Sequence, residues 1–146
     1  MSVTPVHVLL VEDSPADIRL TQEALRDGKI LNTLHIVRDG DEALNFLHQR
    51  GEYSSAPRPG LVILDLNLPK RDGKEVLEDM KRDASLSTIP VAVLTTSAAE
   101  RDIVESYRLG ANCYLTKPVD LAQFLRVVAQ IEEFWLGIVR LPAIVA

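Results

Sequence analysis

The sequence has little of what marks secreted, membrane-spanning or disulfide-rich proteins. It contains a single cysteine, Cys113, which excludes an intramolecular disulfide framework and fits a reducing compartment. No apolar stretch reaches the roughly 20 residues that are needed to cross a bilayer. Residues 1–7 lack the basic and then apolar pattern of a secretory leader. We therefore expect a cytoplasmic protein that has no contact with a membrane.

Positive charge and glycine-rich turns are also scarce. The 16 basic residues are outnumbered by 21 acidic ones, the net charge is −5, and no cluster of Lys and Arg stands out. This balance argues against binding to nucleic acid. The first apolar run is followed by Glu12-Asp13-Ser14-Pro15, which lacks the glycines that a nucleotide phosphate requires at this place. The three histidines are at unrelated positions and have no metal-ligand spacing.

Short apolar runs alternate with amphipathic helical patterns along the sequence. Strands are predicted at 6–11, 33–37, 61–65, 90–95 and 112–116, and the helices that follow them are predicted to end near residues 28, 51, 83, 109 and 136. Residues 52–60 are predicted to form a surface loop. Five strand–helix repeats predict an α/β fold, in which helices cover both faces of a parallel sheet. With 146 residues, 47% of them hydrophobic, we expect one domain with a sizeable core.

Polar side chains stand where four of the apolar runs end. Glu12 and Asp13 follow the first run and Asp65 follows the third. Thr95 ends the fourth run, and Lys117 follows the fifth. Because parallel α/β sheets bind ligands outside the carboxyl ends of their strands, we expect these side chains to share one pocket. An acid after a strand is often only a helix cap, but capping does not explain three acids at two strand ends.

The three acids predict a divalent-cation site. Glu12, Asp13 and Asp65 would repel one another in a common pocket unless a cation lay between them. Two residues after Asp65, the backbone carbonyl of Asn67 can add a fourth oxygen ligand. Carboxylates, a carbonyl and water form the set of hard oxygen ligands that suits Mg²⁺, or Mn²⁺ in its place.

The same pocket has the groups that phosphoryl transfer requires. A carboxylate beside Mg²⁺, here Asp65, can act as the phosphoryl acceptor. Lys117 supplies a compact positive charge for one phosphoryl oxygen, and Thr95 supplies a hydroxyl donor for another. The alternatives are a solvated charge at Lys117 and a plain strand residue at Thr95. Pro118 restricts the turn that directs Lys117, and whether their peptide bond is cis or trans remains open.

These motifs together resemble the receiver domain of two-component response regulators along nearly the whole chain. The matching segments are Val8–Asp13, Asp39–Leu44, Leu61–Asp65, Leu68-Pro69, Asp72-Gly73, Thr95, Gly110-Ala111 and Lys117-Pro118. The resemblance implies a flavodoxin-like, doubly wound α/β fold with five parallel strands in the order 2-1-3-4-5, within a receiver domain at residues 1–136. It also implies that Asp65 accepts the phosphoryl group and that Thr95 and Tyr114 form a switch pair. A plain core position is the alternative for Tyr114.

The sequence is most similar to phytochrome-associated, single-domain response regulators. The segments that carry this narrower similarity are Gly51–Gly60, Glu105–Asn112 and Glu132–Leu136. It implies a signalling protein rather than an enzyme. A histidine kinase, of the phytochrome type, would supply the phosphoryl group, and a histidine phosphotransfer protein is a further candidate partner.

The carboxyl-terminal region is more apolar than a helix covering a sheet requires. The predicted last helix has a second apolar stripe, and the tail at residues 137–146 adds further apolar side chains. We expect a symmetric homodimer, with an interface made by Val127, Ile131, Phe134, Ile138 and Leu141. Packing of the tail on its own domain is the alternative. About ten residues follow the helix, so we expect no DNA-binding output domain.

Two other classes of protein deserve comparison with the receiver interpretation. A phosphatase of the haloacid dehalogenase type would need an aspartate two residues after its nucleophile, as a general acid. Asn67 occupies that position and cannot act as an acid. An adaptor that uses the receiver fold without phosphorylation is the more serious alternative, but such proteins usually lose part of the acidic set, which is complete here.

Overall fold

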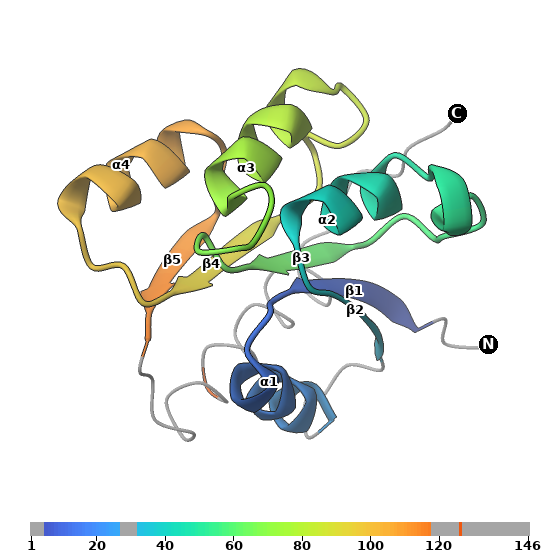
Figure 1. Cartoon of the computed structure of the whole chain (residues 1–146), viewed down its shortest axis with the longest axis horizontal. Coiled ribbons are helices and arrows are strands. Elements are labelled where there is room, and N and C mark those ends of the chain that lie inside the picture. The colour runs from blue at the N-terminus through green and yellow to red at the C-terminus, as the bar shows by residue number, and fades with distance from the viewer. Residues whose placement is uncertain (1–4, 27–31, 118–125, 127–146) are drawn as a thin grey trace.

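The described part of the chain is a parallel five-stranded sheet between two layers of helices. The computed structural model describes residues 5–26, 32–117 and 126. Helix α1 covers one face of the sheet, and α2, α3 and α4 lie together over the other face (Figure 1). The elements are β1 (Val6–Val11), α1 (Pro15–Arg26), β2 (Asn32–Val37), α2 (Gly40–Leu47), the 3₁₀ turn η1 (Gly51–Tyr53), β3 (Leu61–Leu64), α3 (Gly73–Arg82), β4 (Val91–Thr95), α4 (Glu100–Arg108) and β5 (Cys113–Thr116). No described helix is both long and apolar enough to span a bilayer.

The strand order is β2-β1-β3-β4-β5, and all neighbouring pairs are parallel. This order confirms the predicted doubly wound fold. The strand order reverses between β1 and β3, where the carboxyl ends of the two strands are level, because Val11 pairs with Leu64. Such a reversal opens a crevice at the carboxyl edge of the sheet, since the helices that follow the two strands leave toward opposite faces.

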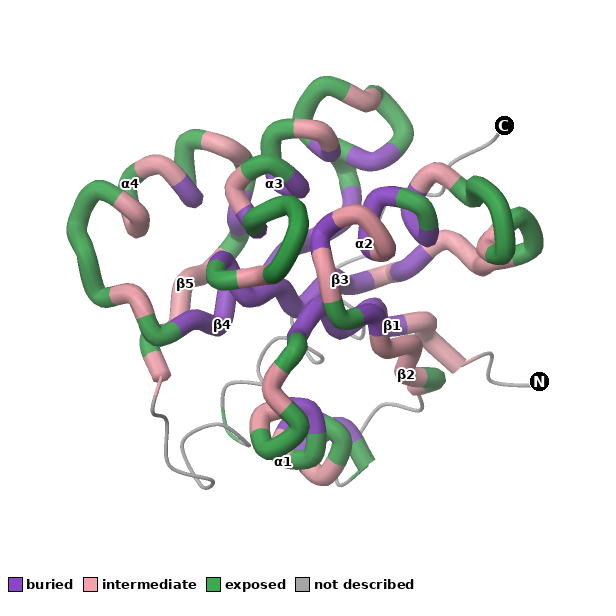
Figure 2. Tube along the Cα trace, viewed as in Figure 1, coloured by how far each residue is buried: buried purple, intermediate pink, exposed green. Residues whose placement is uncertain are grey.

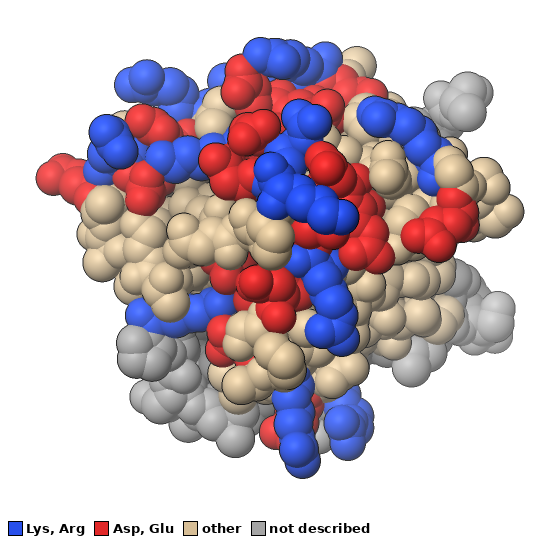
Figure 3. Space-filling model, viewed as in Figure 1, with Lys and Arg blue, Asp and Glu red and all other residues tan. Residues whose placement is uncertain are grey.

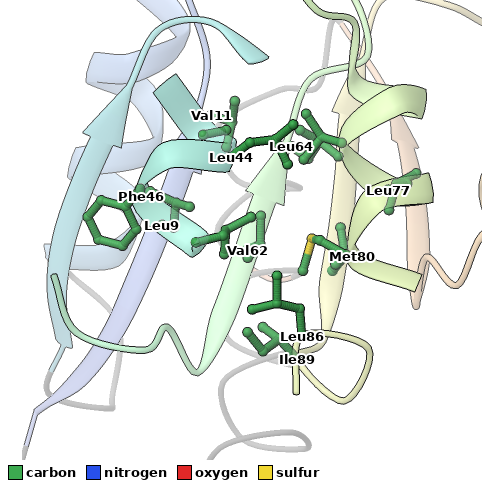
Figure 4. Close-up of a cluster of buried hydrophobic side chains, with 14 of the residues drawn as sticks. Leu9, Val11, Leu44, Phe46, Val62, Leu64, Leu77, Met80, Leu86 and Ile89 are labelled. Atoms are coloured by element: carbon green, nitrogen blue, oxygen red, sulfur yellow. The ribbon is translucent and has the colours of Figure 1, made fainter. Parts of the chain in front are cut away.

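The central strands are packed on both faces, which explains why their sequences are unbroken apolar runs. On one face, Leu9, Val62 and Leu64 pack against Phe46 of α2 and Met80 of α3 (Figure 4). The other face packs against α1, through a cluster that contains Val8, Leu10, Ile18, Leu25, Ile63 and Leu94. In Figure 2, β3 and β4 are accordingly buried throughout and β1 is buried over its carboxyl-terminal part, whereas the helices expose their outer sides. Two packed faces hold the strand ends in fixed positions relative to one another.

Two helices begin with a capping aspartate beside the carboxyl edge of the sheet. Asp39 accepts a hydrogen bond from the backbone N–H of Glu42 and so caps α2, and Asp72 caps α3 in the same way through Glu75. Gly73, the first residue of α3, lies so close to the chain after β3 that a Cβ atom there would stand 2.5 Å from the backbone oxygen of Asp65. Glycine at this position therefore allows α3 to start directly against the end of β3.

The element boundaries differ from the predicted ones by a few residues. Helix α2 ends at Leu47, four residues before the predicted stop at Gly51, because Gln49 and Gly51 both have positive φ angles, of 55° and 56°. The predicted loop then contains the turn η1. Two histidines that were expected to be unrelated, His7 and His35, lie side by side on β1 and β2, with ring nitrogens 3.0 Å apart. The predicted helix at 120–136 lies outside the described residues.

Candidate functional site

Backbone hydrogen bonds fix the residues that follow the strand ends. The N–H of Glu12 donates to the carbonyl of Val37, at 3.0 Å, and the N–H of Asp65 donates to the carbonyl of Val11 at the same distance. The N–H of Lys117 donates to the carbonyl of Thr95, at 2.7 Å. The ladder thus continues one residue beyond the strands, so that the predicted site residues project from a rigid edge rather than from a loop.

The predicted acids meet at this edge. Glu12, Asp13 and Asp65 each offer an oxygen within 4.8 Å of the oxygens of the other two. Glu12 and Asp65 are buried, with 2% and 6% of their surface exposed, and Asp13 is exposed. Burial raises the pKa of Glu12, and the nearby charge of Asp65 raises it further, against the opposing effect of Lys117. Two buried carboxylates with one exposed partner are a donor set that fits a divalent cation open to solvent on one side.

Asn67 contacts Asp65, the predicted acceptor, through its backbone N–H and not through the carbonyl that was predicted to bind the metal. Its backbone N–H donates to Oδ1 of Asp65, at 3.0 Å, and so helps to orient that carboxylate. Its side-chain amide donates to the hydroxyls of Thr95, at 3.3 Å, and Thr96, at 3.1 Å. Asn67 therefore connects the end of β3 to the end of β4, and its carbonyl as a metal ligand stays a prediction.

Lys117 brings a positive charge among these carboxylates. Its Nζ lies 2.6 Å from Oε2 of Glu12, 2.8 Å from Oδ2 of Asp17 and 3.0 Å from Oδ2 of Asp65. Burial by itself lowers the pKa of this ammonium, but the hydrogen bonds to Asp17, Glu12 and Asp65 outweigh burial and raise the pKa above its ordinary value. The side chain is only 9% exposed, so a solvated surface charge, the alternative that the sequence left open, is wrong.

Asp17 belongs to this site, although it was not among the residues selected from the sequence. It lies in the first turn of α1, where an acid is ordinarily explained by the partial positive charge of a helix N-terminus. The available signal was its spacing, because Asp17 follows Asp13 by about one helical turn, at the end of the helix that faces the carboxyl edge. Its contact with Lys117 depends on how α1 packs beside the end of β5, which local sequence patterns do not reveal.

The two predicted switch residues occupy different environments. Thr95 is fully buried, and its hydroxyl accepts the hydrogen bond from Asn67. Tyr114 on β5 is partly buried against the core on the α2 and α3 face, and its hydroxyl donates to the carbonyl of Ser97, at 2.9 Å. Tyr114 is thus attached to the β4–α4 loop, two residues beyond Thr95. The bond to Ser97 places Tyr114 where a switch would act, and its switching role stays a prediction.

A second lysine holds the same loop from outside. Lys74, in the first turn of α3, forms an ion pair with Asp102 and another with Glu105 of α4, the latter at 2.8 Å. Ser97 also hydrogen-bonds to Asp102.

On the face seen in Figure 3, acidic and basic side chains are mixed over the helices, without an extended basic area of the kind that binds nucleic acid.

A parallel sheet in this order, with paired acids after β1, an aspartate after β3, a threonine ending β4 and a lysine after β5, is the arrangement of a signalling receiver. The chain belongs to the response regulator receiver domain family, whose model matches residues 8–129. It is 54% identical over 139 residues to the response regulator Rcp1 of Synechocystis sp., covering 95% of each chain.

Two solved structures extend the likeness to the fold. The Mn²⁺-bound form of Rcp1 has a TM-score of 0.86, at 54% identity, over 95% of this chain and 100% of that one. The phosphorylated cyanobacterial phytochrome response regulator RcpA has a TM-score of 0.88, at 51% identity, over 96% of this chain and 100% of that one. The resemblance to phytochrome response regulators that the sequence suggested is therefore confirmed.

The predicted dimer interface lies outside the part of the chain that the structure describes. All five of its residues, and the apolar tail at 137–146, lie outside the described residues. Within the described part, Val104 and Tyr107 of α4 are the large hydrophobic side chains that are most exposed, each at 48%. The homodimer therefore stays a prediction.

Proposed function

We propose that this response regulator accepts a phosphoryl group from a histidine kinase on Asp65, in a reaction that requires Mg²⁺ or Mn²⁺. The single observation that carries the proposal is the placement of Oδ2 of Asp65, 3.0 Å from Nζ of Lys117 and beside Glu12 and Asp13. The carboxyl edge of the sheet then brings together an acceptor oxygen, a cation for the incoming phosphoryl group and ligands for a metal.

Transfer forms one bond and breaks one. An oxygen of Asp65 bonds to phosphorus, while the bond from phosphorus to the imidazole nitrogen of the donor breaks and its electron pair leaves with that nitrogen. Lys117 stabilises the charge on a phosphoryl oxygen, and the N–H of Asn67 holds the acceptor carboxylate in place. When bound by Glu12, Asp13 and Asp65, the divalent cation would neutralise charge shared by the carboxylate and the phosphoryl oxygens. The Mn²⁺-bound form of Rcp1 supports the metal requirement, and the phosphorylated form of RcpA supports the transfer of a phosphoryl group.

Phosphorylation would then be read by the two switch residues. The hydroxyl of Thr95 would turn from Asn67 toward the new phosphoryl oxygen, as a donor. Tyr114 would exchange its bond to the carbonyl of Ser97 for a more buried position, and the β4–α4 loop would shift with it. The changed surface beside α4 and β5 would carry the signal to another protein.

The partners follow from the similarity to phytochrome response regulators. A kinase of the phytochrome type is the proposed donor, supported by the likeness to RcpA, and a histidine phosphotransfer protein is a second candidate. We further propose a cytoplasmic homodimer, in which residues 1–136 form the receiver domain and the tail at 137–146 contributes to the interface. The competing function, an adaptor that works without phosphorylation, is disfavoured because Glu12, Asp13 and Asp65 are all present and gathered together, with Lys117 paired to Glu12 and Asp65.

The proposal is tested by incubating the protein with Mg²⁺ and radiolabelled acetyl phosphate. We expect the wild type to be labelled and Asp65→Asn to remain unlabelled, because an amide cannot replace the acceptor carboxylate. Asp41→Asn is the matched control, since Asp41 is an exposed aspartate whose partner is Arg71. Equal labelling of the wild type and Asp65→Asn would contradict the proposal, and EDTA should abolish labelling of both active proteins.

A further inference from the structure

Lys117 has no free hydrogen-bond donor in the unphosphorylated site. A lysine ammonium has three N–H groups, and three carboxylate oxygens from Glu12, Asp17 and Asp65 lie within 3.0 Å of its nitrogen. A phosphoryl oxygen on Asp65 needs one of these donors. At least one carboxylate must therefore move away from Lys117, or share its donor, when the phosphoryl group arrives.

Asp17 is the carboxylate that can leave most easily. Its side chain is 32% exposed, whereas the side chains of Glu12 and Asp65 are 2% and 7% exposed. A carboxylate that leaves an ion pair must be hydrated again, and only the partly exposed one is in contact with water from the start. Glu12 is further held by the backbone N–H of Ser14, at 3.1 Å, and Asp65 is the acceptor itself.

The negative charge of Asp17 also disfavours phosphorylation of Asp65. The nearest oxygens of Asp17 and Asp65 both lie within 3.0 Å of the same nitrogen, and so within about 6 Å of each other. A phosphoryl group on Asp65 carries up to two negative charges into this space. Repulsion between Asp17 and the phosphoryl group would therefore oppose the modification that Lys117 favours.

We propose that Asp17 is a positioning residue that occupies Lys117 in the unphosphorylated protein and competes with the phosphoryl group for it. The inference rests on the proposed role of Asp65. Asp17 then lowers both the rate at which the acceptor is modified and the affinity for anions that imitate a phosphoryl group. It acts through Lys117 and does not react itself.

The helix does not need the carboxylate of Asp17 for its own structure. The backbone N–H of Asp17 is capped by the hydroxyl of Ser14, at 3.4 Å, and its carbonyl accepts a bond from the hydroxyl of Thr21, at 2.9 Å. Both contacts use main-chain atoms, which Asp17→Asn retains. The variant thus removes the negative charge while leaving the start of α1 intact.

The test compares Asp17→Asn with Glu23→Gln, a change on the same helix that removes the same charge from an exposed side chain paired with Arg19. Affinity for beryllofluoride in the presence of Mg²⁺, measured by ¹⁹F NMR, reports on Lys117 without any turnover. We expect about fivefold tighter binding for Asp17→Asn, a difference that shrinks at high salt, and no change for Glu23→Gln. The initial rate of labelling by acetyl phosphate should rise by a similar factor.

The outcomes separate this inference from the proposed function. If Asp17→Asn binds beryllofluoride no more tightly than the wild type, at an unchanged thermal midpoint, Asp17 does not compete for Lys117 and this inference is overturned. The proposed function still stands in that case if labelling continues to depend on Asp65. An equal gain in Glu23→Gln overturns this inference too, because the effect would then come from net charge alone. If the wild type takes no label at Asp65, the proposed function fails and this inference fails with it.

Discussion

Lys117 and Lys74, both in the described part of the chain, each lie between acids, and they serve different purposes. Lys117 lies at the carboxyl edge of the sheet, 9% exposed, between groups that come from β1, α1 and β3. Lys74 lies between α3 and α4, 25% exposed, and joins Asp102 and Glu105. The first cluster places three carboxylates around one ammonium that is almost out of contact with water, whereas the second ties two helices together in contact with water. Burial, rather than the ion pairs as such, distinguishes the chemical site.

Removing Lys117 should have the largest effect on stability. Lys117→Ala leaves the three carboxylates without a cation, so we expect the free energy of unfolding in EDTA to fall by about 3 kcal/mol. Mg²⁺ should restore part of the loss, because a divalent cation replaces the missing positive charge. Urea unfolding with and without Mg²⁺ measures both effects. A variant as stable as the wild type in EDTA would show that the buried acids do not depend on Lys117.

Removing Lys74 should have a much smaller effect. In Lys74→Ala both acids keep access to water, so we expect the melting temperature to fall by no more than about 4 °C, and beryllofluoride affinity to stay within twofold of the wild type. Calorimetry and ¹⁹F NMR on Lys74→Ala and Lys117→Ala together provide the measurement. If the two variants lose the same stability, the contrast between the clusters is wrong.

Acid should weaken the Lys74 cluster in a defined direction. The hydrogen bond from Lys74, together with that from Ser97, lowers the pKa of Asp102 below its ordinary value of 3.8. Because the folded pKa is the lower one, the stability that Asp102 contributes is fully present above the ordinary value and is lost as the pH falls below that value and through the folded pKa. The stability difference between the wild type and Asp102→Asn should therefore be constant from pH 7 to 5 and shrink below pH 4. A stability difference that grows on acidification would contradict a lowered pKa of Asp102 in the folded protein.

The strand-end residues were predictable because their positions follow from topology alone. Glu12 and Asp65 each follow a buried apolar run, Lys117 follows a partly buried one, and a parallel sheet must bring the carboxyl ends of its strands to one edge. The strand order, by contrast, came from the resemblance to the receiver family. The α/β fold class and the centre of the site therefore needed no knowledge of helix packing.

The residues that the sequence did not reveal are joined by packing between helices. The partners Lys74 and Asp102 lie 28 residues apart, and Asp17 and Lys117 lie 100 apart. Each contact depends on how a helix is rotated against its neighbours, for which periodicity gives only the buried side. The bond between His7 and His35 likewise needs the register of β1 on β2, in which Leu9 stands opposite His35.

The identity of the phosphorylated residue tests the account most directly. The wild-type protein is incubated with acetyl phosphate and Mg²⁺, reduced with borohydride, which converts an aspartyl phosphate to homoserine, and sequenced by tandem mass spectrometry. We predict homoserine at position 65, and none when EDTA is present. Homoserine at another aspartate, or unmodified Asp65 in a protein that carries phosphate, would contradict the assignment of the buried edge around Lys117 as the site of phosphoryl transfer.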